Sequence, residues 1–298
     1  MKYKNFIKLC RMSQEELRIH LAEQLALYGY LPVIGDGFVY AKGEGCDVLL
    51  TAHLDTVHQE KPKDIVIKKG TISSPQGIGG DDRCGIYIIL RILSETDYRP
   101  SILFCEDEEI GGVGSSKFVD SDYITDLSLM KFLVEIDRHG NNDAVFYSCD
   151  NPDFTDFILD TTGYKENWGT FSDIGNLSPA SGAASVNLSC GYYKEHTKEE
   201  YVVYDEMMHT KNVVVKLLKA AKSCDFFEYI EEEITWSTSP KTYGYSMEQQ
   251  VWIMYQDGGQ DLEEFYTGSS MYEAFGMFFY DHPHLRFNDI LDYDVYLV

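Results

Sequence analysis

Four short motifs rich in histidine and acidic residues recur along this 298-residue chain at intervals of about 28 residues, close to the roughly 30 residues that one β-α-β unit takes. Strand-like apolar runs directly precede three of the motifs, and the remaining motif directly precedes a helix-like run. The motifs would therefore fall once per unit, at the carboxyl ends of parallel strands, where open α/β sheets bind ligands. This spacing predicts an α/β fold whose functional site lies along one edge of the sheet. The residues that mark the motifs are His53, Asp82, Glu109 and Asp137.

Hydrophobic periodicity predicts the elements between the motifs. Ser13 and Glu16 form a capping-box pattern for a helix that ends at Gly29, and Thr197 with Glu200 repeats that pattern ahead of a second helix. Helices are predicted over 14–28, 84–93, from 115 onward and over about 198–224, and strands over 37–41, 47–52, 101–106, 132–137, 144–149 and 185–190. Strands alternating with helices predict a three-layer α/β fold, with a mostly parallel mixed sheet flanked by helices.

Composition excludes several classes of function. The net charge of −24 repels phosphate backbones and anionic lipids, so neither a nucleic-acid partner nor a membrane partner is expected. The seven cysteines are odd in number and include no Cys-x-x-Cys pair, which favours reduced thiols over a disulfide framework. The first residues show no secretory pattern, and no apolar stretch is long enough to span a bilayer. We therefore expect a soluble cytoplasmic protein.

The character of the sequence changes after Cys224. Residues 1–224 contain all the motifs, whereas 225–298 form an acidic segment rich in tyrosine, phenylalanine and methionine, with no motif. Within it, 246–252 could begin one more helix and 257–259 read as a turn. We expect a catalytic domain over 1–224 and an appendage over 225–298. Its aromatic content favours a buried role, either over the rim of the active site or at the interface of a homo-oligomer.

The chemistry of the site follows from crowding. The predicted edge also receives His196, which precedes the last predicted helix, so it collects two histidines and several carboxylates. Carboxylates packed so closely repel one another unless cations lie between them. Each motif alone has an ordinary interpretation: a surface His-Asp pair, a solvated acidic run, or a glycine-rich turn without the ending of a phosphate-binding loop. Their joint order and spacing favour a site for two divalent metal ions, with zinc preferred and cobalt or manganese as alternatives.

Residues 1–224 resemble the co-catalytic di-zinc exopeptidases, which include peptidase T, carboxypeptidase G, aminoacylase and single-domain aminopeptidases. The matching segments are HLDTV at 53–57, GIGGDDRCG at 77–85, EDEEIGG at 106–112 and EIDRHG at 135–140. The resemblance implies that Asp82 bridges the two metals, that Glu109 and His196 complete one site, and that His53 and Asp137 complete the other. It also implies that Glu108 is the general base and that Asp55 orients the imidazole of His53.

These roles predict a metal-dependent hydrolase that cleaves a terminal peptide bond of short peptides through an activated water. The stretch between Asp137 and His196 is too short for the lid domain of many relatives, which favours an aminopeptidase because no lid would read a substrate carboxylate. One alternative is a deacylase or amidase that acts on N-acyl amino acids with the same metal site. A second is a non-catalytic binding protein, which would have no need of Glu108 or Asp55.

The remaining polar residues near the motifs receive weaker interpretations. Asp173, in a segment where relatives carry a Thr/Ser-Asp motif, could support the site or contact substrate. Asp81 reads as a turn residue. Four further histidines read as structural or exposed, with His282-Pro-His284 as a weak adventitious metal site; they are His139, His209, His282 and His284.

Overall fold

The computed structural model describes residues 2–169, 171–231, 249–257, 260–268, 278, 282 and 290–297. Its contacts separate the chain into two compact units, Met1–Glu233 and Ile234–Val298. The first unit contains all the motifs. The two units are described here one at a time.

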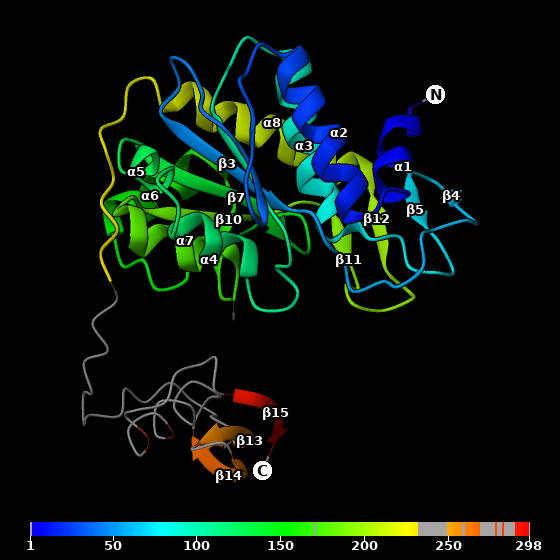
Figure 1. Cartoon of the computed structure of the whole chain (residues 1–298), viewed down its shortest axis with the longest axis vertical. Coiled ribbons are helices and arrows are strands. Elements are labelled where there is room, and N and C mark those ends of the chain that lie inside the picture. Colours follow the sequence, from blue (N-terminus) through cyan, green and yellow to red (C-terminus); the bar gives the residue numbers. More distant parts are fainter. Residues whose placement is uncertain are drawn as a thin grey trace. The chain divides into compact units, whose positions relative to one another are not determined.

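An eight-stranded mixed sheet forms the centre of the first unit (Figure 1), in the order β1-β2-β6-β3-β7-β10-β8-β9. The four central strands, β6, β3, β7 and β10, run parallel to one another. Their side chains are almost all buried, which explains why these strands read as continuous apolar runs in the sequence. The strands are β1 (Val33–Ile34), β2 (Phe38–Ala41), β3 (Val48–His53), β6 (Ser101–Cys105), β7 (Phe132–Arg138), β8 (Asp143–Val145), β9 (Lys165–Asn167) and β10 (Ser185–Ser189).

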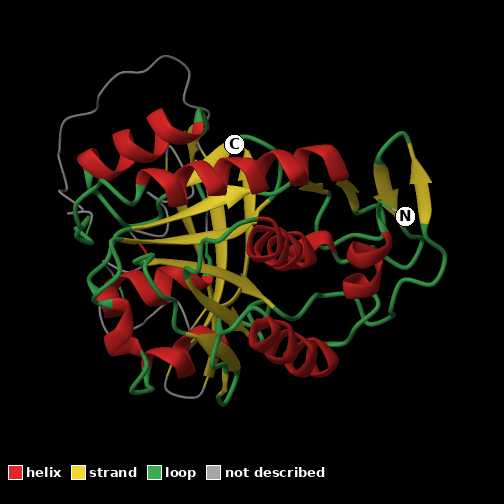
Figure 2. Ribbon diagram, turned by 90° about the horizontal axis from the view of Figure 1, so that it is seen from above, coloured by secondary structure: helices red, strands yellow, loops and turns green. Residues whose placement is uncertain are grey.

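Helices cover both faces of this sheet (Figure 2), so the structure confirms the predicted three-layer α/β fold. One apolar cluster joins the sheet to α1 (Lys4–Cys10), α2 (Gln14–Leu27), α3 (Gly80–Glu95), α6 (Pro152–Thr162) and α8 (Tyr204–Ala220). A smaller cluster joins the opposite face to α4 (Val113–Val119), α5 (Ile124–Leu127) and α7 (Asp173–Ser181). The predicted capping box of Ser13 and Glu16 is present at the start of α2.

The second predicted capping box is wrong. Instead of starting a helix, Glu200 directly precedes a short strand, β12 (Tyr201–Val203), and α8 begins only at Tyr204. The Glu200 carboxylate is buried and accepts hydrogen bonds from a turn that lies far away in the sequence. A tertiary contact therefore replaces the local cap that the pattern predicted.

A small antiparallel sheet lies beside the main one and joins two distant parts of the chain. It is made of β4 (Val66–Lys68), β5 (Thr71–Ser73), β11 (Tyr192–Tyr193) and β12, in the order β11-β12-β5-β4. Strand β12 pairs with β5, so the segment that carries His196 is held against the segment that leads into α3. This pairing brings the second and the last motifs together.

The first unit extends past the boundary predicted after Cys224. The amide of Phe227 donates to the carbonyl of Lys131, and the carbonyl of Phe227 accepts from the amide of Ala184, each at 2.9 Å. The amide of Tyr229 donates to the carbonyl of Gly182 at 2.8 Å. These partners lie at the amino ends of β7 and β10. Residues 225–231 therefore pack along the edge opposite to the one that carries the motifs.

The second unit contains three antiparallel strands, β13 (Gln249–Asp257), β14 (Gln260–Gly268) and β15 (Ile290–Leu297), in the order β14-β13-β15. The helix predicted to begin near 246 is wrong for its described part, because residues 249–252 lie in β13. Val251, Ile253 and Tyr255 are buried while the residues between them are partly exposed, which is the alternation of a strand. The predicted turn lies outside the described residues at 258–259, with Asp257 and Gln260 paired on either side.

Two further observations concern the whole described chain. Its helices include none that is long and apolar enough to cross a bilayer. All seven cysteines are free thiols, and five of them are buried, as the sequence predicts for reduced core residues.

Candidate metal centre

The carboxyl edge of the central strands gathers the predicted site residues. His53 ends β3, Asp137 lies near the end of β7, and Glu109 follows β6 in the loop before α4. His196 lies between β11 and β12, on the segment that the small sheet holds in place. The edge predicted from the motif spacing is therefore the place where these four side chains meet.

Asp81 occupies the centre of the cluster, between the two histidines. Its Oδ1 lies 2.9 Å from His53 Nε2, and its Oδ2 lies 3.3 Å from His196 Nε2. Asp137 Oδ1 flanks the first histidine, 3.7 Å from His53 Nε2, and Glu109 Oε2 flanks the second, 2.9 Å from His196 Nε2. One carboxylate thus faces two histidine-carboxylate pairs, one with each oxygen.

Asp82, expected at that central position, lies elsewhere. It is fully buried, and its Oδ1 accepts a hydrogen bond from the amide of Gly85 at 2.8 Å. Asp81, expected to be only a turn residue, holds the central position instead. The backbone at both aspartates departs from helical dihedrals at the start of α3, so their side chains have different surroundings. Motif spacing cannot distinguish two adjacent aspartates, whereas the backbone does.

Asp55 joins the histidine of one motif to the acidic loop of another. Its Oδ1 lies 3.1 Å from His53 Nδ1 and accepts from the amide of Glu108 at 3.0 Å, and its Oδ2 accepts from the amide of Glu109 at 3.0 Å. Burial acts to raise the pKa of Asp55, but the hydrogen bonds from His53 and from the two amides hold that pKa below its ordinary value. With Nδ1 engaged by Asp55, Nε2 of His53 points toward Asp81 and Asp137.

Three residues that sequence reasoning missed support the cluster. Tyr192 donates its hydroxyl to Asp137 Oδ1 at 3.1 Å. Asn187 accepts from the amide of Asp137 and donates to its carbonyl, each at 2.8 Å, which fixes the backbone at the end of β7. Glu200 accepts from the amide of Asp81 at 3.0 Å. The signal that could have found Tyr192 and Glu200 is their place in the sequence, four residues before and four residues after His196.

The electrostatics of the cluster favour bound cations. Burial and the charge of Asp81 raise the pKa of Asp137 to about 8, and burial raises the pKa of Glu108 to about 9. Hydrogen bonds to Asp81 and Glu109 raise the pKa of His196 to about 11. Within the described chain, Glu109 Oε1 is buried and has no hydrogen-bond partner. Positive charge placed between carboxylates held this close stabilises their ionised forms.

The residues present fit a metal. The ligand atoms of His53, Asp81 and Glu109 lie within 4.8 Å of one another. Asp137 and His196 extend this set on either side of Asp81. Imidazole nitrogens combined with carboxylate oxygens suit zinc, and they also accept cobalt or manganese.

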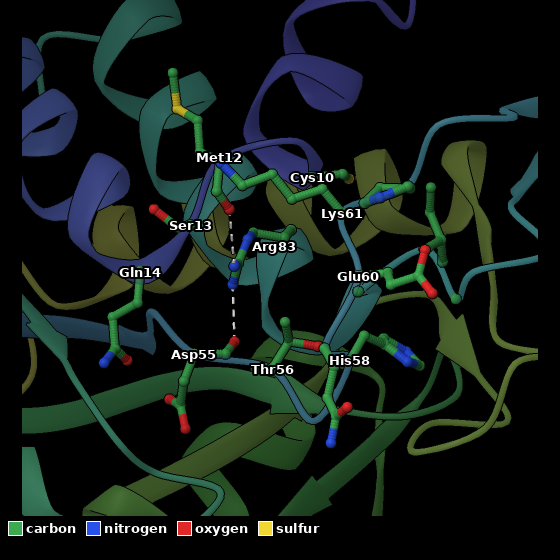
Figure 3. Close-up of a pocket in the computed structure, with 15 residues that line it drawn as sticks. Cys10, Met12, Ser13, Gln14, Asp55, Thr56, His58, Glu60, Lys61 and Arg83 are labelled. Atoms are coloured by element: carbon green, nitrogen blue, oxygen red, sulfur yellow. Dashed lines mark hydrogen bonds between the residues drawn. The ribbon is translucent and has the colours of Figure 1, made fainter.

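A cavity of about 210 Å³, drawn in Figure 3, is lined by Asp55, whose side chain contacts His53 of the cluster. Arg83 of α3 is buried at this cavity and donates to the carbonyl of Asp55 at 2.8 Å and to the carbonyl of Met12 at 3.4 Å. His58 also lines the cavity. Arg83 therefore fastens the loop after β3, which carries Asp55, to the connection between α1 and α2.

The other residues singled out in the sequence lie around or away from the cluster. Asp173 is the first residue of α7 and is fully buried, and burial raises its pKa. His139 Nδ1 lies 2.6 Å from Glu195 Oε1, and His209 is exposed and stacks on Tyr164. In the second unit His282 Nε2 lies 3.1 Å from Glu264 Oε2, while His284 lies outside the described residues.

Comparison of the sequence with family models and with curated proteins finds no match for this chain. Comparison of the structure does find similar solved structures. A tripeptidase from Staphylococcus aureus is 14% identical with a TM-score of 0.60, and the alignment covers 75% of this chain and 98% of that one. The aminopeptidase PepT from Bacillus cereus is 14% identical with a TM-score of 0.59, covering 74% and 98%.

A third similar structure is the TET1 peptidase of Pyrococcus horikoshii, which can assemble into a tetrahedron or a large octahedral shell. It is 12% identical with a TM-score of 0.53, and the alignment covers 73% of this chain and 98% of that one. All three solved structures are described as peptidases. This chain therefore has the fold of these peptidases, in agreement with the resemblance seen in its motifs.

Proposed function

We propose that this protein is a two-metal exopeptidase that removes the amino-terminal residue of short peptides. The observation that carries the proposal is the position of Asp81, whose two oxygens face two histidines, each flanked by a further carboxylate. His53, Asp81 and Asp137 would hold one ion, and Asp81, Glu109 and His196 would hold the other. Zinc is the proposed metal, with cobalt or manganese as substitutes.

Divalent ions at these positions would supply Lewis-acid activation of a water molecule and of the scissile carbonyl. Glu108, next to the proposed ligand Glu109, is the proposed general base. Its amide is held by Asp55, which fixes the start of the side chain relative to the cluster. Burial raises the pKa of Glu108, and nearby cations would favour its ionised form. Glu108 would accept the proton of the attacking water and pass it to the leaving amine.

The chain between Asp137 and His196 supports an aminopeptidase. Its described residues form β8, α6, β9, α7, β10 and β11 of the first unit. These residues therefore belong to the central fold, and none of them forms a lid that could bind a substrate carboxylate. The solved structures with this fold include an aminopeptidase and a tripeptidase.

Two alternatives use the same scaffold. A deacylase or amidase acting on N-acyl amino acids would need the same metals and the same base, and would differ only in its substrate pocket. A non-catalytic binding protein would not need a base, whereas Asp55 here bonds the backbone of both Glu108 and Glu109. The backbone at Glu108 is therefore fixed beside the cluster, which favours an enzyme.

Metal content and hydrolysis, measured on one sample, test the proposal. We expect about two ions per chain, hydrolysis of unblocked di- and tripeptides, loss of activity with a chelator and recovery with zinc. Hydrolysis of N-acyl amino acids but not of peptides would favour the deacylase. No bound metal after zinc addition, and no hydrolysis, would refute the two-metal site.

A single substitution separates the enzyme from the binding protein. Glu108→Gln should lower kcat by about 10²–10⁴-fold while both metal ions stay bound, because the amide cannot accept the proton of the water. Glu44→Gln, at an exposed position away from the cluster, is the matched control and should leave kcat unchanged. Unchanged hydrolysis in Glu108→Gln would contradict the proposed base.

Two broader proposals accompany this function. The seven free thiols favour a reducing compartment, and we propose the cytoplasm. The assemblies of the TET1 peptidase make a homo-oligomer of this chain a proposal to test by its mass in solution.

A further inference from the structure

We infer that Glu200 is a positioning residue, which holds Asp81 in the orientation that lets its two oxygens face two metal ions. The inference rests on the proposed function and adds to it a residue that would not touch metal or substrate. It starts from an observation that the mechanism does not use: a fully buried carboxylate, directly before β12, that is bonded to the backbone of Asp81.

Three hydrogen bonds define the surroundings of Glu200. Its Oε1 accepts from the amide of Asp81 at 3.0 Å, and its Oε2 accepts from the amide of Gly79 at 2.8 Å. Oε2 also lies 2.6 Å from His58 Nε2. Both oxygens are therefore engaged, and two of the three contacts go to the turn that carries Asp81. A carboxylate that accepts two amides fixes the direction of the peptide planes between them.

The carboxylate of Glu200 is buried, away from the water that would otherwise solvate it. Its side chain is fully buried, and among the described residues its ion-pair partner is His58 and no Lys or Arg. Burial of a carboxylate carries a large desolvation cost unless the group is paired and hydrogen-bonded. A simple turn could be closed by a neutral side chain at lower cost. The carboxylate of Glu200 bonds the turn that carries Asp81, and so holds the Asp81 side chain in one orientation.

One short segment holds Asp81 from two directions. His196 faces Oδ2 of the Asp81 side chain, while Glu200, four residues later, bonds the Asp81 amide. The turn fits closely against this segment: a Cβ added to Gly80 would lie 3.2 Å from Glu200 Oε1 and 2.5 Å from a methyl carbon of Val202. Side chain and backbone of Asp81 are thus fixed by the same short stretch of chain.

His58 extends the contact to the loop after β3. Its imidazole lines the cavity of Figure 3 and packs over Gly77, where an added Cβ would overlap the ring. The same loop carries Asp55, whose carboxylate orients His53. Glu200 therefore connects three segments that each provide a proposed ligand: those of His53, Asp81 and His196.

Zinc binding by the metal-free protein tests the inference, because it needs no turnover. Glu200→Gln keeps the size of the side chain but replaces one oxygen with an NH2 group. That group cannot accept a hydrogen bond from the amide of Gly79 or Asp81. Glu200→Ala removes both acceptors, and Glu199→Gln, at the exposed neighbouring position, is the control. Each full-length variant is stripped of metal, titrated with zinc against a competing chelator, and then assayed for kcat and KM on a tripeptide. The melting temperature in chelator reports folding separately.

We expect Glu200→Gln to melt like the wild type without metal, to bind zinc about 10- to 100-fold more weakly, and to lose kcat more than it changes KM. Glu200→Ala should weaken zinc binding further, and Glu199→Gln should behave as the wild type. Wild-type zinc affinity and kcat in a folded Glu200→Gln protein would overturn the inference.

If Glu200→Gln does not fold, a second variant still tests the inference. Glu200→Asp keeps the charge but is one methylene too short to reach both amides, so weaker zinc binding would support the inference and wild-type binding would overturn it. Failure of the proposed function has a different signature. In that case the wild-type protein itself would bind no zinc, whatever residue stands at position 200.

Discussion

At the scale of single residues, the surroundings of two adjacent aspartates assign them different tasks. Burial acts to raise the pKa of Asp81, but contacts with His196 and His53 lower it below its ordinary value. Burial, followed by the charge of Asp137, raises the pKa of Asp82 well above its ordinary value. Asp81 therefore faces two histidines, whereas Asp82 accepts a hydrogen bond from the amide of Gly85 in buried surroundings that disfavour its charge.

This difference predicts opposite effects of the same substitution. Asp81→Asn should lose bound metal and lower kcat by at least about 10²-fold, because a neutral amide cannot serve two cations. Asp82→Asn should keep metal and most activity, because asparagine has nearly the same size and its Oδ1 can still accept the hydrogen bond from the amide of Gly85. Metal content and tripeptide hydrolysis of the two variants show which aspartate bridges the proposed metal ions. Metal loss in Asp82→Asn alone would restore Asp82 as the bridging residue.

At the scale of elements, α3 packs unusually close to β7. A Cβ added to Gly85 would lie 2.3 Å from the carbonyl oxygen of Ile136 and 2.5 Å from Asp82 Oδ2. The near approach of backbone to backbone places the start of α3, and with it Asp81, beside the strand that carries Asp137. Glycine is needed at this position because any side chain would separate the helix from the strand.

Gly85→Ala should therefore destabilise the protein by about 1–3 kcal/mol, because the helix and strand must move apart. The matched control is Gly175→Ala in α7, where an added Cβ meets no atom within 4 Å. That substitution should be neutral, or stabilising by up to about 1 kcal/mol, because alanine favours a helix. Urea unfolding of both variants measures the difference, and equal midpoints would contradict the close packing of α3.

At the scale of the whole molecule, the two compact units divide the chain at a different place from the change in composition. Residues 225–231 have the acidic and aromatic character of the rest of the segment, yet their backbone bonds to the amino ends of β7 and β10. The aromatic ring of Phe227 packs against Phe132, Phe154 and Phe157. These residues therefore contribute to the stability of the first unit.

Two truncations test this division. A chain that ends after Glu233 should keep the melting temperature of the first unit, because it retains every contact of 225–231. A chain that ends after Cys224 should melt several degrees lower, because the bonds and ring contacts of Phe227 and Tyr229 are lost. Calorimetry measures both, and light scattering on the same samples reports whether removing 234–298 changes the oligomeric state. Equal melting of the two truncations would contradict the extended boundary.

The sequence alone determined the layered fold and the edge of the sheet where the motifs meet. Strands buried on both faces must be apolar throughout, and parallel strands must recur about once per β-α-β unit. Apolar runs at a regular spacing can therefore be recognised in the sequence. The order and spacing of the motifs were therefore enough to bring His53, Glu109, Asp137 and His196 to one edge. The contact of Asp55 with His53 was also predictable, because the two residues share one short motif and the family resemblance implied it. The bonds of Asp55 with the amides of Glu108 and Glu109 were not, because these residues lie more than fifty positions away.

Only the tertiary structure decided between Asp81 and Asp82, and only it showed where Glu200 points. The backbone departs from helical dihedrals at both aspartates, and the turn before them is held by Glu200, more than a hundred positions away. The capping-box pattern at Thr197 and Glu200 was misleading for the same reason. A local pattern records which partners a side chain can find nearby, whereas a buried carboxylate takes the donors that the whole fold brings to it.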